Sequence, residues 1–202
     1  ASAGEAGGGC RRTGVHVSGE VAAEDGVAVR KVAVRAAIGP AQLEACGNRG
    51  GIAREKATIF EGLEAGGIAV IPSGLTTTPI LAAGAAKADR ILRFGAEDDD
   101  DYRLTGVTLA PDTTVVQANR NGVPFVFKVQ TAGRHFAANA LGVLAVAEAV
   151  GADPAVAACD IGLWRPPAGR GQRQRIYMDI VDENLSFDLI DDAFNANPAS
   201  ME

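Results

Sequence analysis

Residues 51–71, GIAREKATIFEGLEAGGIAVI, contain the pattern that decides the fold, a helix followed by a buried strand. In 51–63 the large apolar side chains recur at helical spacing and share one face. They are Ile52, Ile59, Phe60 and Leu63. Gly66-Gly67 are expected to end the helix, and the apolar run 68–71 is typical of a buried strand. A helix that leads into an apolar strand predicts an α/β domain.

Further helices and strands alternate along the chain. Apolar runs predict strands at 32–38, 88–95, 175–181 and 186–192, and Ala-rich segments predict helices at 133–151 and 154–163. Asp153-Pro154 is expected to cap the second of these helices. Three more strand-like segments lie at 102–110, 113–119 and 123–130, with the hairpin signal Asn121-Gly122 between the last two. We therefore expect a mostly parallel sheet that is flanked by helices and made mixed by an antiparallel insertion.

Composition and charge argue against several classes of partner. The chain has 202 residues and a net charge of −6, which disfavours broad electrostatic binding to nucleic acid or to an anionic membrane. No window has the apolar length of a membrane span, and the first residues do not resemble a secretion signal. Cys10, Cys46 and Cys159 are far apart and lack Cys-x-x-Cys spacing. We expect three free thiols in a reducing compartment, the cytoplasm.

Two further segments have the composition of ligand sites but lack the pattern that such sites require. Residues 1–14 are Gly-rich and patternless, and we interpret them as a disordered or non-homologous leader. Their Gly7-Gly8-Gly9 has no preceding strand and no Gly-Lys-Ser/Thr, as a nucleotide loop requires. The acidic run EDDDD (97–101) is interpreted as a solvated loop, because a metal site needs a convergence of side chains that neighbours in sequence do not promise.

The most specific pattern lies near the end of the chain. LIDDAFNANPASM (189–201) resembles the Mur ligase family, MurF type, in which the matching text reads much like "IDD-S/A-Y/F-NANP-x-SM". Three further blocks resemble this family in the same order. They are IGPAQLEACGNRGGIAREKATIFEGL (38–63), GRHFAANALGVLA (133–145) and RPPAGRGQR (165–173). The resemblance covers residues 15–202, and four ordered blocks are much more specific than any one of them.

This resemblance implies both a fold and an activity. The fold is the Mur ligase central domain, which belongs to the P-loop-containing superfamily. The activity is the ATP-dependent addition of D-alanyl-D-alanine to UDP-N-acetylmuramoyl-tripeptide in peptidoglycan synthesis, and hence in cell wall biogenesis, cell shape and cell division. ATP phosphorylates the tripeptide carboxylate and leaves as ADP, with magnesium bridging the phosphates. The amine of D-alanyl-D-alanine then attacks the acyl phosphate, and phosphate leaves. The full-length enzyme is expected to be a cytoplasmic monomer.

Lys56 and Gln42 match the positions that hold magnesium in this family. The resemblance implies that Lys56 is carbamylated, which converts an ammonium into an oxygen ligand suited to Mg²⁺. Gln42 stands where the family usually has a metal-binding histidine, and its amide oxygen is a neutral and weaker ligand. Taken without the resemblance, Lys56 is an ordinary exposed helix lysine.

The block at 133–145 matches a helix that the family places near the nucleotide. His135 and Asn139 are four residues apart and therefore share a helix face. The resemblance implies that this face binds the nucleotide, with Asn139 hydrogen-bonded to the base or the ribose. A polar residue that serves helix packing is the alternative for Asn139. Phe136 stands where the family commonly has asparagine, which removes one polar contact.

The last two blocks supply candidate contacts to phosphate and ribose. Arg170 lies in Gly-Arg-Gly, where a guanidinium can neutralise phosphate charge, although an exposed basic loop is the alternative. Asp191 and Asp192 are expected to end a strand at the carboxyl edge, where α/β sheets bind ligands. The resemblance implies that one of them contacts the ATP ribose. Asn195 and Asn197 are expected to shape a hinge to a following domain.

One part of the family pattern does not occur in the sequence, the phosphate loop of the type G-x-x-G-K-T. We therefore expect 15–190 to be a partial central domain, 191–202 to be a hinge, and the chain alone to be inactive. Two other functions stay open. A non-catalytic module that binds nucleotide or a partner protein is favoured by Gln42, Phe136 and the missing phosphate loop. Another ligase of the superfamily, such as a folylpolyglutamate synthase, is opposed by the NANP block.

Overall fold

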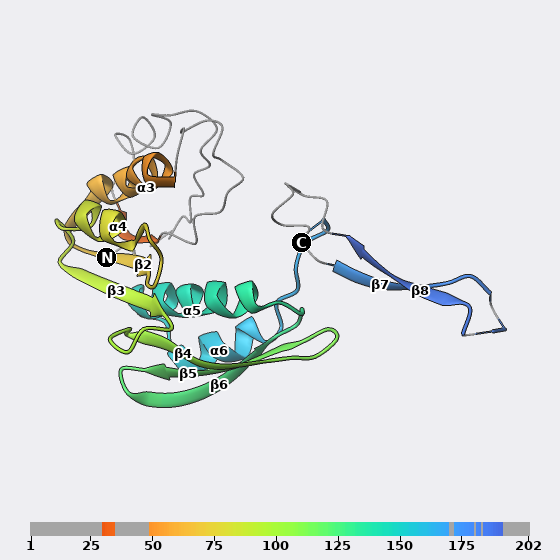
Figure 1. Ribbon diagram of the computed structural model, residues 1–202. Coiled ribbons are helices and arrows are strands. Elements are labelled where there is room, and N and C mark those ends of the chain that lie inside the picture. Colours follow the sequence, from red (N-terminus) through yellow and green to blue (C-terminus); the bar gives the residue numbers. More distant parts are fainter. Residues whose placement is uncertain (1–29, 35–48, 170–171, 180, 183, 192–202) are drawn as a thin grey trace, which may run out of the picture.

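The computed structural model describes residues 30–34, 49–169, 172–179, 181–182 and 184–191. In chain order, the elements are β1 (Arg30–Val34), α3 (Arg49–Ala57), η2 (Thr58–Gly62), β2 (Leu63–Pro72), α4 (Thr78–Gly84), β3 (Arg90–Gly95), β4 (Tyr102–Leu109), β5 (Thr114–Arg120), β6 (Val123–Val129), α5 (Arg134–Ala149), α6 (Pro154–Ile161), β7 (Gln172–Tyr177) and β8 (Ser186–Asp191). Figure 1 shows a body of sheet and helices from which the β7–β8 hairpin projects. None of the helices in these ranges is long and apolar enough to cross a membrane.

Strands β1 to β6 form one mixed sheet, in the order in which they occur along the chain. Strands β1, β2, β3 and β4 run parallel to one another, with Val70 opposite Leu92 and Phe94 opposite Tyr102. Strands β4, β5 and β6 form an antiparallel meander. Asn121 and Gly122 connect β5 to β6 with φ values of 48° and 84°, as Asn-Gly hairpin turns require. The predicted mixed sheet with its antiparallel insertion is confirmed.

The two faces of this sheet carry separate apolar cores, because successive side chains of β2 point to opposite faces. Ala69 and Ile71 pack with Phe60 beneath α3, η2 and α4. Val70 belongs to the other core, where Leu141 of α5 is also buried. Figure 1 shows the resulting layers, with α3 and α4 on one side of the sheet and α5 on the other.

The helices after the meander agree with the sequence. The helix predicted at 133–151 is α5, and the one predicted at 154–163 is α6. Asp153 caps α6 as expected, because its Oδ1 accepts hydrogen bonds from the N–H groups of Ala155 at 2.8 Å and Val156 at 3.0 Å. Helix α5 carries the candidate nucleotide residues, so its packing on the meander, together with that of α6, determines the side on which those residues lie.

Other element boundaries differ from the prediction. The helix expected at 51–63 is α-helical only to Ala57, and η2 continues it as a tighter 3₁₀ turn. Gly66-Gly67 do not end a helix but lie inside β2, where Gly66 has a φ of 80° and the register against β1 shifts. The sequence does not predict α4, because its seven residues are too short for a clear helical period.

Strands β7 and β8 also differ from the expected arrangement. β7 begins at Gln172, inside the segment predicted as a basic loop, and pairs antiparallel with β8. The two strands form a sheet of their own instead of extending the main sheet. Asp191 therefore ends a strand of this hairpin, and the prediction that it lies at the carboxyl edge of the α/β sheet is wrong.

Candidate functional site

Lys56 lies on the buried face of α3. Its exposed fraction is 5%, and Ile52, Ala53 and Ala57 are buried on the same side of the helix. Helix α4 packs closely here, since a Cβ added at Gly84 would lie 2.6 Å from the Cβ of Ala57. The interpretation of Lys56 as an ordinary exposed helix lysine is therefore wrong. Lysine is seldom so buried unless its ammonium is paired, because removing an ammonium from water is costly.

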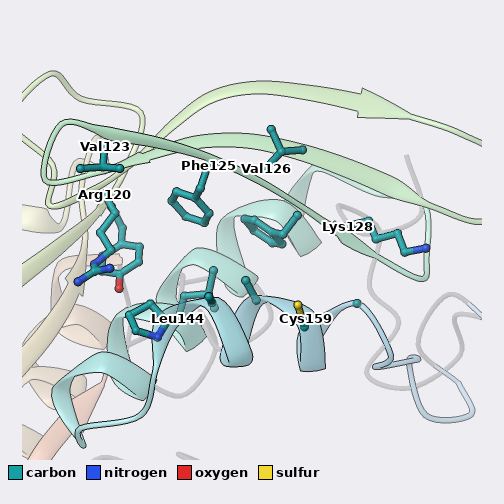
Figure 2. Close-up of a pocket in the computed structure, with 13 residues that line it drawn as sticks. Arg120, Val123, Phe125, Val126, Lys128, Leu144 and Cys159 are labelled. Atoms are coloured by element: carbon teal, nitrogen blue, oxygen red, sulfur yellow. The ribbon is translucent and has the colours of Figure 1, made fainter.

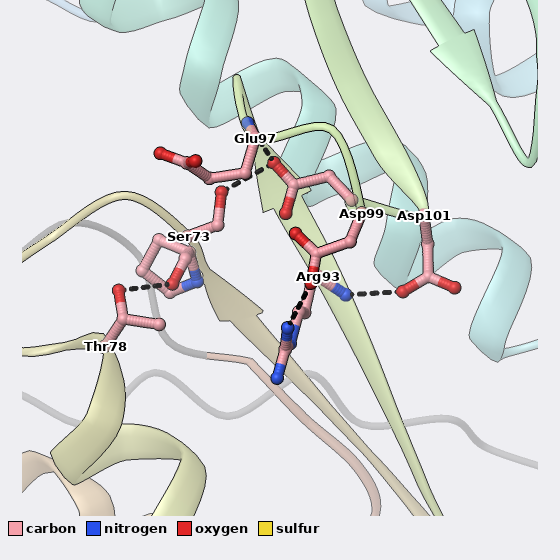
Figure 3. Close-up of polar contacts among 8 residues, drawn as sticks. Ser73, Thr78, Arg93, Glu97, Asp99 and Asp101 are labelled. Atoms are coloured by element: carbon pink, nitrogen blue, oxygen red, sulfur yellow. Dashed lines mark hydrogen bonds and ion pairs between the residues drawn. The ribbon is translucent and has the colours of Figure 1, made fainter.

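The loops that follow β2 and β3 meet at the carboxyl edge of the parallel strands, as Figure 3 shows. The N–H of Ser73 donates to the carbonyl of Phe94 at 2.9 Å, and its hydroxyl donates to Oδ2 of Asp100 at 2.5 Å. The same carboxylate oxygen accepts the N–H of Glu97 at 2.9 Å. Gly95 makes room for this contact, because a Cβ there would lie 2.0 Å from the Ser73 Oγ. The two loops are thus joined by one shared carboxylate.

Asp100 is the buried member of the acidic run, with an exposed fraction of 8%. Its Oδ1 has no hydrogen-bond partner in the part of the chain that the structure describes. Burial raises the pKa of Asp100 above its usual value, and the hydrogen bonds from Ser73 and Glu97 only partly oppose this. The prediction of a solvated loop holds for the exposed Glu97, Asp98 and Asp99 but is wrong for Asp100.

The other carboxylates of this run bind groups of neighbouring strands. Oδ2 of Asp101 accepts the N–H of Arg93 at 2.8 Å. The Arg93 guanidinium pairs with Asp99 at 2.8 Å, and Arg103 pairs with Asp98 at 2.6 Å. Within the described ranges, no group of three His, Cys, Asp or Glu side chains is placed to hold a metal ion. The acidic run therefore stabilises the connection from β3 to β4.

His135 and Asn139 are both exposed on the first turns of α5. The start of the helix is fixed by Gly133, whose N–H donates to Oγ1 of Thr114 at 3.0 Å. Gly133 has a φ of 151°, and a Cβ there would lie 2.9 Å from the His135 ring. The structure thus places both predicted nucleotide residues where a ligand from solvent can reach them.

Phe136 has a packing role between these two positions. Its ring centroid lies 4.1 Å from that of His135 and 5.9 Å from that of Trp164. Trp164 follows α6, so Phe136 connects the start of α5 with the segment that leads to β7. The residue that stands in place of the family's asparagine therefore contributes apolar contact instead of a polar group.

Asp191 contacts the Gly-Arg-Gly loop that the sequence singled out. Its Oδ2 accepts the N–H of Gly169 at 3.0 Å, and Gly169 has a φ of 78°, which favours glycine. This hydrogen bond joins the end of β8 to Gly169, the residue that precedes Arg170. The remaining candidates lie outside the described residues. They are Gln42, Arg170, Asp192, Asn195 and Asn197.

A polar network that the sequence does not reveal joins β4, β5 and α5. The hydroxyl of Tyr102 donates to Oε2 of Glu148, and Nε of Arg120 donates to the same oxygen at 2.8 Å. Tyr102 is only 1% exposed. Burial, and then the hydrogen bond to Glu148, raise the pKa of the Tyr102 hydroxyl. No local spacing signals this network, since its members come from three elements.

The comparisons with known proteins decide the family. A family model of the Mur ligase middle domain matches residues 13–147. The chain belongs to this family. It is 25% identical over 189 residues to the UDP-N-acetylmuramoyl-tripeptide–D-alanyl-D-alanine ligase of Bacillus subtilis (strain 168), a match that covers 94% of this chain and 38% of that ligase. The chain thus spans less than two fifths of the length of this Mur ligase relative.

Solved Mur ligases have the same fold. MurF from Acinetobacter baumannii is 25% identical with a TM-score of 0.82, over 93% of this chain and 39% of that one. The MurF ligase of Thermotoga maritima, solved in complex with ADP, has a TM-score of 0.65 at 23% identity, over 77% of this chain and 35% of that one. The predicted resemblance to MurF-type Mur ligases and the predicted central-domain fold are confirmed.

Proposed function

We propose that this chain is part of the ATP-binding middle domain of a ligase that joins D-alanyl-D-alanine to UDP-N-acetylmuramoyl-tripeptide in peptidoglycan synthesis. The observation that carries the proposal is the match to the Bacillus subtilis ligase along 94% of the chain. In this proposal the full-length protein is a cytoplasmic monomer. The three cysteines without disulfide spacing support a reducing compartment.

Lys56 is the proposed magnesium-holding residue. Its burial on α3 supports this role, because a carbamylated side chain at a buried position offers fixed, carboxylate-like oxygen ligands. Gln42 is the proposed second ligand, through its amide oxygen. When bound, magnesium neutralises phosphate charge during the transfer from ATP to the tripeptide carboxylate.

The proposed nucleotide contacts come from α5 and from the Gly-Arg-Gly loop. The exposed side chains of His135 and Asn139 are accessible to a base or ribose. The hydrogen bond from Gly169 to Asp191 supports a joint site, in which Arg170 binds phosphate and Asp191 binds ribose. Asp192, Asn195 and Asn197 complete the proposed hinge next to this site.

A second candidate function is a non-catalytic nucleotide-binding module. Two observations favour it for the chain by itself. Phe136 packs against His135 and Trp164 instead of offering a polar group. None of the lysines follows a glycine, so the sequence has no Gly-Lys-Thr phosphate loop. We therefore propose that the chain alone does not catalyse ligation.

Calorimetric titration of the purified chain with Mg-ATP separates these proposals. Micromolar binding that Asn139→Ala weakens at least several-fold supports a nucleotide site on α5. Val143→Ala is the matched control, because Val143 is one turn further along α5 and is 56% exposed. Binding that is equal in wild type and Asn139→Ala contradicts the assignment of Asn139. No detectable binding refutes the independent nucleotide-binding module and leaves ligation to a longer protein.

A phosphate-release assay tests the statement about activity. The chain is incubated with Mg-ATP, UDP-N-acetylmuramoyl-tripeptide and D-alanyl-D-alanine, and we expect no release above a blank without protein. Turnover that requires both substrates would contradict the proposed inactivity of the chain.

A further inference from the structure

A cavity of about 570 Å³ lies between β6 and α6, and Figure 2 shows the side chains around it. Phe125 and Phe127 of β6 line one wall, with ring centroids 5.7 Å apart and planes 14° from parallel. Ala155 and Ala158 of α6 line the opposite wall, and Leu144 of α5 lines the cavity between them. This volume is within the roughly 300–1,000 Å³ that is typical of small-molecule sites.

The cavity exists because the side of α6 that faces β6 carries small side chains. Ala155 and Ala158 cannot fill the space opposite the two phenylalanine rings, whereas the larger Val156 points to solvent and is 59% exposed. Protein interiors are normally packed without such space. None of Lys56, His135, Asn139 or Asp191 lines the cavity, so it is separate from the proposed nucleotide and magnesium residues.

The charged groups of the cavity are cationic. Arg120 lies at one end and Lys128 at the other, and none of the described residues that line it is acidic. Nε of Arg120 is occupied by Glu148 at 2.8 Å, which balances the charge at that end. Lys128 is exposed, and no acidic partner for it occurs among the ion pairs of the described residues. The Lys128 end therefore attracts a negative group.

We propose that this cavity binds a small apolar acid. The apolar body lies between the rings of Phe125 and Phe127 and the small side chains of α6. The acidic group pairs with the ammonium of Lys128, which lies beyond the apolar walls, at the rim of the cavity, and points away from the two rings in Figure 2. Apolar walls with few polar groups that fix the orientation are the usual composition of a ligand site.

Two fluorescent probes test the proposal. Anilinonaphthalene sulfonate and phenylnaphthylamine share one aromatic body, and only the first carries an acidic group. We expect both to bind the wild-type chain, with the sulfonate binding more tightly. Lys128→Gln should weaken the sulfonate about two- to five-fold, as the loss of one exposed ion pair does, and leave the neutral probe unchanged. Lys87→Gln removes another exposed lysine and should change neither affinity.

A filled cavity supplies the second test. Ala155→Trp places an indole in the space from an exposed position and should abolish binding of both probes. Val156→Trp, one residue further on the exposed side, should leave both affinities unchanged, and circular dichroism verifies that both variants fold. In a chain with Cys10 and Cys46 changed to serine, the sulfonate should also slow alkylation of Cys159, which lines the cavity.

Each contrary result overturns the proposal. Failure of both probes to bind the wild type, or unchanged binding to a folded Ala155→Trp variant, excludes the cavity as the site. Equal affinities for the two probes, together with no effect of Lys128→Gln, exclude recognition of an acidic group. Alkylation of Cys159 at the same rate with and without the sulfonate places the probe elsewhere, whether or not Ala155→Trp folds.

Discussion

Substitution of Gly95 by alanine should strain the contact between the loops that follow β2 and β3. The added Cβ would lie 2.0 Å from Oγ of Ser73 and 3.0 Å from Oδ2 of Asp100. Overpacking of this kind costs about 1–3 kcal/mol, while alanine in a strand gains about 0.5–1 kcal/mol over glycine. We expect Gly95→Ala to lower the free energy of unfolding by about 1–2 kcal/mol as the net of these two effects.

A double-mutant cycle identifies the cause of this loss. Ser73→Ala alone removes a hydrogen bond to a carboxylate and should cost about 1–2 kcal/mol. In the double variant the Oγ is absent, so the alanine at 95 loses its closest clash and keeps contacts of 3.0 Å and 3.3 Å. The double variant should therefore be about 1 kcal/mol more stable than the sum of the single effects predicts.

Urea unfolding followed by far-ultraviolet circular dichroism measures all of these free energies. Gly106→Ala is the control, because the nearest atoms to its new Cβ all belong to the exposed Gln117 side chain, whose amide oxygen at 2.8 Å can move away. It should not be destabilised and should gain up to about 1 kcal/mol over wild type, because Gly106 also lies in a strand, where alanine is favoured over glycine by about 0.5–1 kcal/mol. Additivity of Gly95→Ala and Ser73→Ala within about 0.5 kcal/mol would refute the argument.

Three further predictions concern other polar contacts. Tyr102→Phe should lower the free energy of unfolding in urea by about 1–2 kcal/mol, because Glu148 loses a buried donor, and a variant as stable as wild type would contradict the network. Folding raises the pKa of Asp100, so the contribution of this carboxyl to stability is full below its unfolded pKa and is lost as pH rises through its folded pKa. Asp100→Asn should therefore flatten this part of the curve of unfolding free energy against pH. A variant curve that runs parallel to the wild-type curve would disprove the assignment to Asp100. Asp153→Ala should cost about 1 kcal/mol in urea unfolding through loss of the α6 cap, with Asp153→Ser close to wild type, and equal losses in both variants would argue against capping.

The sequence predicts the main sheet well, because each of its strands carries a local signal. Asn121-Gly122 defines a hairpin without any tertiary information, and the apolar run 68–71 lies within β2. The β7–β8 sheet is different, since the same strand signal is compatible with pairing to the main sheet or to another strand. Gly66 illustrates a similar limit, because a glycine that ends a helix and one that forms a bulge cannot be distinguished from sequence alone.

The candidate site is only partly predictable for a related reason. The separation of His135 and Asn139 by four residues predicts that they share one face of a helix, and the structure shows both exposed on α5. The burial of Lys56 is a property of the tertiary packing around α3, which the neighbouring residues in the sequence do not signal. Ser73 and Asp100 are 27 residues apart, and they meet only because β2 and β3 are parallel neighbours. The contacts of the hinge candidates Asn195 and Asn197 stay predictions.

Strand β4 has a parallel neighbour on one side and an antiparallel neighbour on the other, which has a consequence for the order of assembly. The β4–β5–β6 meander is joined by short turns, and α5 follows it directly, so its contacts are local and close with little loss of chain entropy. The pairing of β1 with β2 and of β2 with β3 requires longer crossovers, through α3 and α4, and is therefore expected to form later. We therefore expect the antiparallel part to fold early as a cooperative unit, and the free edge of β4 to act as the template on which β3, then β2 and β1, are added.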